Sequence, residues 1–494
     1  MIGSNRVNVN SSNVSNSGYT VSRYTNQRFS QHNVLLLVLA IIVAFRAGVW
    51  LDVALAGNNA GAAFNVWPDT GQAKCYDNYG EIPCPAPDEP FYGQDAQYQG
   101  LKRSYAKLGQ GGVELPDSAT VADGWIMTRD NVTGLIWEIK TDDGGIHDKN
   151  NVYTWCDHDS STNGGNEGTC GNGTDTEDFI NALNLYNFGG YSDWRLPTIK
   201  ELSTLVNSNI PSPYPTIDIE YFPNTLSSSY WSSTTGAIHL YSAWDVDFRT
   251  GHSSIDVIGR SKDYYYKYVR AVRAGQDSLL DHLVDNHDGT ITDTATGLMW
   301  QKCSMGQVYN ASTNGCDGSA STYIWKEALA ECENLELAGH DDWRLPNRNE
   351  LQSIVDYSRS KPSTITTYFP NTVLSGYWSS TTLVDHPAFA WHVNFKRGDV
   401  ANYNKYDYDY VRAVRAGQSS SFGNLELGDV SGDGQITIVD ALLVARYAVG
   451  LSVAKFNADA ADVDCNSQIN IVDALLIAIK SAGLPVPTWC GSGT

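Results

Sequence analysis

Basic residues are scarce in this chain of 494 residues, which has 33 Lys and Arg against 55 Asp and Glu and a net charge of −22. A surface that binds nucleic acid needs clustered positive charge to neutralise phosphates. The composition therefore argues against a nucleic-acid partner. The excess of carboxylates is equally compatible with cation binding and with a charge that only keeps the chain soluble.

Catalytic motifs are also missing. The sequence has no Gly-x-Ser-x-Gly, no His-Glu-x-x-His, no glycine-rich phosphate loop and no Cys-x-x-Cys. Each of these patterns would place a nucleophile, a metal or a phosphate in a defined local geometry. The histidines, among them His287, His386 and His392, are scattered without ligand spacing. The sequence therefore predicts no enzymatic activity.

Long hydrophobic runs are absent except near the start, where Val34 to Phe45 are apolar. Twelve residues are too few to span a bilayer but match the apolar region of a signal peptide. Ala54-Leu55-Ala56 has the small-x-small pattern that signal peptidase cuts. We expect residues 1–56 to be a signal peptide cleaved after Ala56, which leaves no stable membrane span and an extracellular or cell-surface protein. The alternative is an uncleaved anchor over residues 34–56, although charges inside a span are costly.

The nine cysteines include several closely spaced sets, which an exported chain would oxidise. The predicted disulfides are Cys75–Cys84, Cys156–Cys170, Cys303–Cys316 and Cys465–Cys490. This leaves Cys332 free or paired with another chain, and the sequence alone does not fix the connectivity. Residues 57–121 are rich in Gly, Pro and Ala with few apolar runs, so we expect a linker that contains the small Cys75–Cys84 loop.

One large segment occurs twice. Thr-Gly-Leu-x-Trp ends at Trp137 and Trp300, and Asp-Trp-Arg-Leu-Pro recurs around Trp194 and Trp343. Tyr-Trp-Ser-Ser-Thr-Thr and Tyr-Val-Arg-Ala-Val-Arg then follow in the same order in both copies. The separation of equivalent residues falls from 163 to 149 between the first two motifs, so copy one has about 14 extra residues near Cys156–Cys170. Two duplicated domains are predicted, over residues 122–276 and 284–418.

Each copy combines helical and alternating patterns, which predicts an α+β fold. We expect Trp194 and Trp343 to be framework residues, and Arg195 and Arg344 to pair with Glu201 and Glu350. Exposed aromatic candidates precede the last strand of each copy. They are Tyr264, Tyr265, Tyr266, Tyr403, Tyr406 and Tyr408. These side chains form either a stacking surface for a ligand or an ordinary tyrosine-rich strand.

The repeated motifs resemble the DUF1566 family, which includes the C-terminal domain of the Legionella collagen-like adhesin. The resemblance covers both copies and implies two tandem C-type lectin-like domains in a surface or secreted protein, with glycans among the ligands. The Glu-Pro-Asn and Trp-Asn-Asp triplets of calcium-dependent sugar sites do not occur here. The reactive cysteines of the related sulfatase-modifying enzymes are missing from the last motif, so neither activity transfers.

Two segments near the C-terminus have the spacing of calcium loops. Oxygen-bearing side chains stand at loop positions 1, 3, 5, 7 and 12, where they converge on one hard cation. The predicted ligands are Asp429, Ser431, Asp433, Gln435 and Asp440 in the first loop and Asp462, Asp464, Asn466, Gln468 and Asp473 in the second. An apolar helix follows each loop. We therefore predict two Ca²⁺ ions, with a weaker second site because Ser467 replaces the loop glycine.

Asp at position 12 and a helix after each loop resemble a type I dockerin, here a small all-α domain over residues 424–494. The resemblance implies calcium binding and recognition of a cohesin-like module. It places the partner contacts on Ile438, Val439, Ile471 and Val472, which are apolar where cellulosomal dockerins often have Ser-Thr. The partner is therefore a different cohesin-like module or the same chain in self-association. Calcium could also serve only to fold this segment.

These features together predict a secreted or cell-surface binding and adhesion protein. Its lectin-like domains would contact a glycan or another surface ligand, while the dockerin tethers them. The alternative is a structural subunit of an extracellular fibre or surface layer, without a small-molecule ligand.

Overall fold

The computed structural model describes residues 63–64, 67–98, 100–255, 261–274, 276–277 and 282–416, and in the C-terminal segment residues 427–428, 430, 436–448, 460–464, 469–481 and 486. The predicted signal peptide, residues 1–56, lies outside these ranges, as do Cys465 and Cys490. Within the described ranges, no helix is long and apolar enough to cross a membrane.

Each copy of the repeat forms a small sheet from its first and last motifs. In copy one the spatial order is β11 (Val272–Arg273), β7 (Ile136–Glu138), β6 (Met127–Asp130), β4 (Tyr105–Leu108) and β5 (Glu114–Leu115). In copy two it is β13 (Leu283–Asp285), β14 (Thr290–Asp293), β15 (Leu298–Gln301) and β23 (Val414–Ala416). Trp137 pairs with Val272, and Trp300 pairs with Val414, so the first and last motifs of each copy lie on neighbouring strands.

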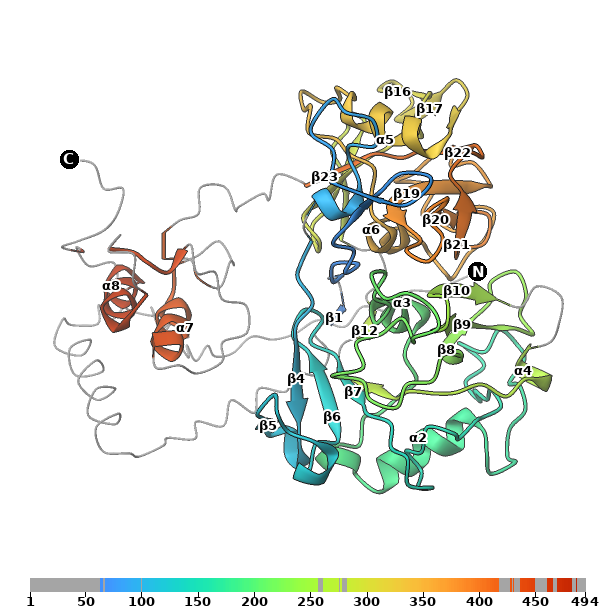
Figure 1. Ribbon diagram of the computed structural model, residues 1–494, viewed down its shortest axis with the longest axis vertical. Helices are drawn as coiled ribbons and strands as arrows, with labels where there is room; N and C mark the ends of the chain where they lie inside the picture. Colours follow the sequence, from blue (N-terminus) through green and yellow to red (C-terminus); the bar gives the residue numbers. More distant parts are fainter. Residues whose placement is uncertain are drawn as a thin grey trace, which may run out of the picture.

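The two copies share one central sheet of eight strands (Figure 1). Its order is β18 (Thr322–Tyr323), β22 (Asp409–Tyr410), β19 (Gly376–Thr382), β20 (Phe389–Asn394), β21 (Asp399–Asn404), β10 (His252–Ile255), β9 (Ala243–Asp247) and β8 (Ser229–Thr235). Strand β21 of copy two pairs antiparallel with β10 of copy one, with Val400 opposite Ser253. These two strands are equivalent in the repeat, so a local twofold axis relates the copies.

Equivalent helices flank this sheet. In copy one they are α2 (Thr176–Leu185) and α3 (Ile199–Thr204), and in copy two α5 (Trp325–Glu333) and α6 (Arg348–Ser353). A capping box starts α3 at Thr198 with Glu201 and α6 at Asn347 with Glu350. Pro197 and Pro346 directly precede the capping residues Thr198 and Asn347. The predicted pairs are confirmed, since Arg195 and Arg344 each make two hydrogen bonds to the capping-box glutamate.

The remaining regular elements are short. They are the pairs β1 (Ala63–Phe64) with β12 (Gln276–Asp277), β2 (Cys75–Tyr76) with β3 (Glu81–Ile82) and β16 (Val308–Asn310) with β17 (Gly315–Asp317), helix α4 (Ser261–Tyr264) and the 3₁₀ helices η1 (Asp95–Gln97), η2 (Gln110–Gly112), η3 (Val121–Asp123) and η4 (Phe188–Gly190).

Tryptophans fill the core of both copies. Trp194 and Trp343 of the Asp-Trp-Arg-Leu-Pro motif are buried, in agreement with a framework role. One hydrophobic cluster runs through both copies and includes Trp137 and Trp300. At the contact between the copies the rings of Trp244 and Tyr357 lie 4.9 Å apart, edge to face. The copies therefore form one packed α+β body, called the head below.

The prediction of a linker over residues 57–121 is wrong for the part that the structure describes. Strands β4 and β5 belong to the sheet of copy one. Residues 67–98, called the strap below, pack against copy two. The side chain of Gln72 accepts a hydrogen bond from Thr382 N at 2.9 Å and donates one to Thr382 O at 2.8 Å. The composition hid this structure because the strap folds only against distant residues.

Three of the predicted disulfides are present: Cys75–Cys84, Cys156–Cys170 and Cys303–Cys316. The fourth, Cys465–Cys490, falls on residues outside the described ranges. Cys332 lies in α5 as a free, fully buried thiol. Burial raises the pKa of this thiol well above its usual value, which keeps it protonated and unreactive.

Helices α7 (Ile438–Ala448) and α8 (Ile471–Ser481) form the described core of the C-terminal segment. They pack against each other through Val444 and Ile477, and Val430 and Val463 belong to the same cluster. Each helix begins where a predicted calcium loop ends. The fold of this segment is therefore all-α over the described residues, as the sequence predicts.

Candidate functional sites: calcium loops, docking face and pocket

The second calcium loop brings three of its predicted ligands together. Carboxylate oxygens of Asp462, Asp464 and Asp473 lie within 4.8 Å of one another. Backbone N–H groups of Asn470 and Val463 donate to Asp473 at 2.9 and 3.0 Å, which holds its carboxylate toward the loop. Burial raises the pKa of Asp473, and the neighbouring carboxylate of Asp464 adds to this effect. Convergent carboxylates of this kind fit a hard cation such as Ca²⁺.

In the first loop the structure describes the closing ligand. Asp440 is fully buried at the start of α7, and its Oδ2 accepts hydrogen bonds from Thr437 N and Thr437 Oγ1. This arrangement matches that of Asp473 at the start of α8. The other predicted ligands, Asp429, Ser431, Asp433, Gln435, Asn466 and Gln468, lie outside the described residues.

Apolar side chains at the start of each helix point away from the core. Ile438, Val439, Ile471 and Val472, the predicted partner contacts, are all exposed, with between 46% and 59% of each residue accessible. Leu442 and Leu475, 52% and 42% exposed, lie one turn further along α7 and α8. The sequence interpretation missed these leucines, although their spacing of four from the isoleucines was a readable signal. We call these six residues the docking face.

The candidate tyrosines are exposed, but their setting differs from the one expected. Tyr264 ends helix α4, and Tyr265 and Tyr266 follow it, so copy one has no tyrosine-rich strand there. In copy two, Tyr403 lies on β21 and stacks on His392 with ring centroids 5.3 Å apart. The hydroxyl of Tyr406 bonds to that of Tyr79 in the strap at 2.9 Å, and Tyr408 follows in the same exposed loop.

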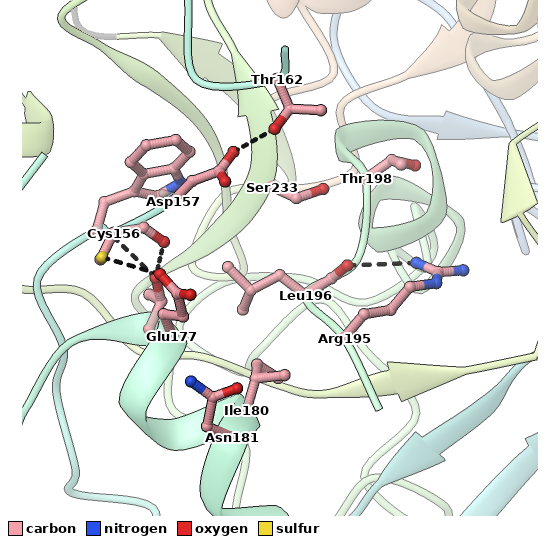
Figure 2. A pocket seen from close by; sticks show the side chains of 12 residues that line it. Cys156, Asp157, Thr162, Glu177, Ile180, Asn181, Arg195, Leu196, Thr198 and Ser233 are labelled. Carbon is pink, nitrogen blue, oxygen red and sulfur yellow. Dashed lines mark hydrogen bonds between the residues drawn. The ribbon is translucent and has the colours of Figure 1, made fainter. Parts of the chain in front are cut away.

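Copy one has a cavity of about 510 Å³ that no sequence motif indicated. We call the extra segment of copy one around Cys156–Cys170 the insertion. Figure 2 shows side chains converging on the cavity from the insertion, from α2 and from the segment that leads into α3. The lining residues are Trp155, Cys156, Asp157, Thr162, Thr176, Glu177, Ile180, Asn181, Arg195, Leu196, Thr198 and Ser233. The readable signal was the 14-residue excess of copy one, since Asp157 and Thr162 belong to it.

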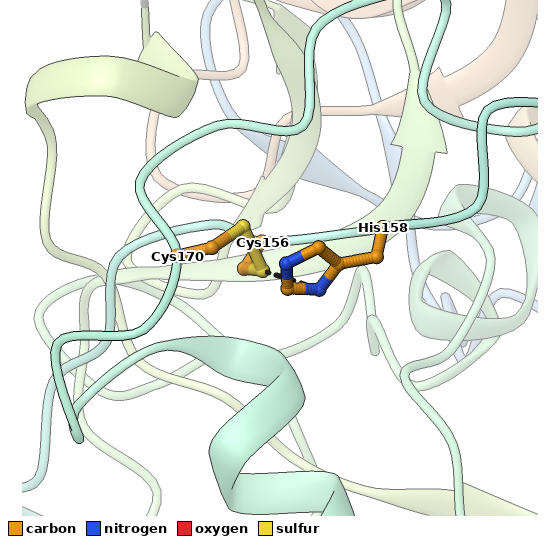
Figure 3. Close-up of side chains that lie close together, drawn as sticks. All are labelled: Cys156, His158 and Cys170. Atoms are coloured by element: carbon orange, nitrogen blue, oxygen red, sulfur yellow. Dashed lines mark hydrogen bonds between the residues drawn. A yellow bond between two sulfur atoms is a disulfide. The ribbon is translucent and has the colours of Figure 1, made fainter.

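Cys156, His158 and Cys170 lie close enough to hold a metal ion (Figure 3). Their chemistry does not fit one here, because the two cysteines form a disulfide and a metal binds thiolates. His158 Nδ1 instead lies 2.5 Å from Glu177 Oε2, and this contact raises the pKa of His158. The group is therefore a disulfide with a neighbouring ion pair.

Family comparisons define the class of each part. The family model described as Lcl C-terminal domain matches residues 126–273 and 289–415, which together exceed half of the chain. The model described as dockerin type I domain matches residues 427–479. No curated protein matches this chain. The chain belongs to the Lcl C-terminal domain family, with two copies of that domain followed by a type I dockerin.

Proposed function

We propose that this chain is an extracellular adhesion protein whose calcium-loaded dockerin binds a cohesin-like module on a partner. The head, with two copies in one body, would present the surface that adheres. Type I dockerins bind calcium and cohesins, and Lcl C-terminal domains suggest surface adhesion. Three disulfides are consistent with an oxidising compartment.

The docking face is the observation that carries this proposal. Six exposed apolar side chains in two equivalent sets are unusual on a domain this small, and such patches commonly mark protein interfaces. Each set begins inside a calcium loop, because Ile438 and Ile471 precede the closing ligands Asp440 and Asp473 by two residues. Calcium binding would therefore fix the first turn of each helix and the face itself.

The test is calcium-dependent binding of the full chain to a panel of purified type I cohesin modules. The variant I438D/V439D/I471D/V472D should lose binding by at least a hundredfold, because four charges would enter an apolar contact. The control V308D/I219D introduces two aspartates at exposed apolar residues of the head and should bind as the wild type. Calcium titration of both variants shows whether the dockerin still folds.

Two results together would contradict the cohesin proposal and favour self-association: the full chain binds no cohesin, and it forms multimers that the docking-face variant abolishes.

For the head we propose a C-type lectin-like fold and a glycan or another surface ligand. Exposed tyrosines near Tyr264 and Tyr406 support stacking on sugar rings. A glycan array probed with the full chain and with Y264A/Y266A and Y406A/Y408A tests this, and equal signals for all three proteins would exclude the tyrosine surfaces.

A further inference from the structure

The strap fills a groove on copy two whose counterpart on copy one is open. Phe91 of the strap packs near Trp325, with ring centroids 6.3 Å apart, and Lys326 Nζ lies 5.4 Å from the Phe91 centroid. The hydroxyl of Tyr98 lies 2.8 and 2.9 Å from the two carboxylate oxygens of Glu333. Residues 91–98 thus run from the start of α5 to its end.

Asp95 anchors the middle of this segment. Its Oδ2 accepts hydrogen bonds from Thr381 Oγ1 at 2.5 Å and from Thr70 Oγ1 at 2.8 Å, and its side chain is buried. The guanidinium of Arg344 lies 5.1 Å from the Tyr98 ring centroid. The groove therefore recognises a short segment that includes the 3₁₀ helix η1, through an aromatic contact, a carboxylate and a tyrosine.

Copy one preserves the walls of this groove. The indole of Trp155 donates to Ser232 O as that of Trp325 donates to Ser379 O. Thr234 accepts a hydrogen bond from the backbone N–H of Ile199 at 3.0 Å, and Thr381 accepts the equivalent bond from Arg348.

The residues that line the two grooves also correspond. Arg195 corresponds to Arg344, and Glu177 on α2 corresponds to Lys326 on α5. Trp155, Glu177 and Arg195 all line the open cavity of copy one.

The insertion of copy one covers only one end of its groove. There the ammonium of Lys262 lies 4.0 Å from the Trp155 ring centroid and donates to Asn163 O and Asn166 O. In copy two Lys405 lies 3.7 Å from the Trp325 centroid and donates to Asp77 O in the Cys75–Cys84 loop of the strap. The insertion loop thus replaces the disulfide loop of the strap. The space that residues 91–98 fill on copy two corresponds to the cavity on copy one.

We propose that the open groove of copy one binds a short peptide segment of a partner protein, in the manner in which copy two binds residues 91–98 of its own chain. The partner peptide has a carboxylate at the place of Asp95, near Thr234 and Arg195. It has a basic side chain four residues earlier, at the place of Phe91.

Charge complementarity supports the basic residue. Where copy two has Lys326 beside Phe91, copy one has Glu177, and Asp157 lines the same cavity. Glu177 pairs there with the exposed His158, and Asp157 accepts a hydrogen bond from Thr162. An aromatic residue at that point would take water from both carboxylates and add no charge to offset them, whereas a Lys or Arg would add a further ion pair. This proposal concerns a surface of the head, so its failure would leave docking to a cohesin untouched.

The probes are a synthetic peptide with the sequence of residues 87–99 and its F91K variant, titrated against the full chain by calorimetry. We expect saturable binding at one site, several-fold tighter for F91K, because one partly exposed ion pair contributes modestly. E177K makes copy one resemble copy two and should reverse the preference. N181W fills the mouth of the cavity from an exposed position and should abolish binding.

The control is A330W, the same change at the equivalent exposed position of copy two, which should leave both affinities unchanged. No saturable binding of either peptide would overturn the proposal. Binding lost in A330W and kept in N181W would also overturn it, because the peptide would then be displacing the strap. Equal affinities of both peptides for the wild type and for E177K would contradict the basic residue.

Discussion

Ser253 of β10 lies directly opposite Val400 of β21, its own counterpart in the second copy. A second equivalent pair lies near the same axis, where Gln352 Nε2 donates to Ser203 Oγ at 3.1 Å. His252 Nε2 lies 2.7 Å from Asn402 Nδ2, and Arg348 donates to Gly251 O at 2.7 Å. The duplication therefore produced an intramolecular dimer with one continuous sheet.

This arrangement predicts that the two copies unfold together. V400P disturbs the sheet at the junction, where proline cannot donate to the ladder, and should separate one calorimetric transition of the head into two. V400A keeps the backbone pairing and should retain a single transition at a lower temperature. Two transitions already in the wild-type head would contradict the shared sheet.

The buried carboxyl of Asp95 predicts an unusual pH dependence. Burial raises its pKa from 3.8 to about 7, with Asp69 and Glu350 adding repulsion and Arg344 lying nearby. The folded state therefore holds a proton that the unfolded state has lost, and stability falls as pH rises from about 4 to about 7. The full shift corresponds to about 4 kcal/mol.

D95N stays neutral at every pH and should remove this part of the pH dependence. The measurement is the difference in unfolding temperature between D95N and wild type at pH 5 and at pH 8. We expect the unfolding temperature of D95N, measured relative to that of the wild type, to be higher at pH 8 than at pH 5. Burial lowers the pKa of the Lys405 ammonium to about 6, so Lys405 also contributes to the pH dependence. Both proteins contain Lys405, and the difference between them therefore reports the effect of Asp95 alone. Equal differences at both pH values would show that Asp95 does not carry the effect.

The Cys75–Cys84 disulfide should hold the strap on copy two. The variant C75A/C84A removes a cross-link between two residues that are nine positions apart. This should lower the free energy of unfolding by about 2–3 kcal/mol and weaken the hydrogen bond from Lys405 to the Asp77 carbonyl. Limited proteolysis should then cut within residues 67–98 while the rest of the head stays intact. The control C303A/C316A removes a disulfide of similar span elsewhere in copy two and should leave the strap resistant. Equal resistance of the strap in all three proteins would contradict this role.

Local patterns predicted much of this architecture. The duplicated motifs gave the two copies, the Arg195–Glu201 and Arg344–Glu350 pairs and the buried tryptophans. The loop spacing led to the carboxylates that converge at Asp462 and Asp473. All of these depend on residues that are close in sequence or repeated in register.

The strap and the open groove could not be predicted in this way. Gln72 and Thr382 are 310 residues apart, and the strands of the strap are two residues long, too short for a periodic signal. Residues 57–121 also have the glycine and proline content of a linker. The groove of copy one depends on comparing two folded copies, since only copy two shows what the groove can hold.

Calcium control of the docking face is tested most directly by hydrogen exchange of the full chain, followed peptide by peptide with and without a chelator. Calcium should protect the amides of α7 and α8, and chelation should remove that protection, because the carboxylates of Asp462, Asp464 and Asp473 then repel without a cation. Peptides from residues 100–255 of the head should exchange equally in both conditions and serve as the internal control. Undiminished protection of residues 438–448 and 471–481 in chelator would contradict a docking face that calcium folds.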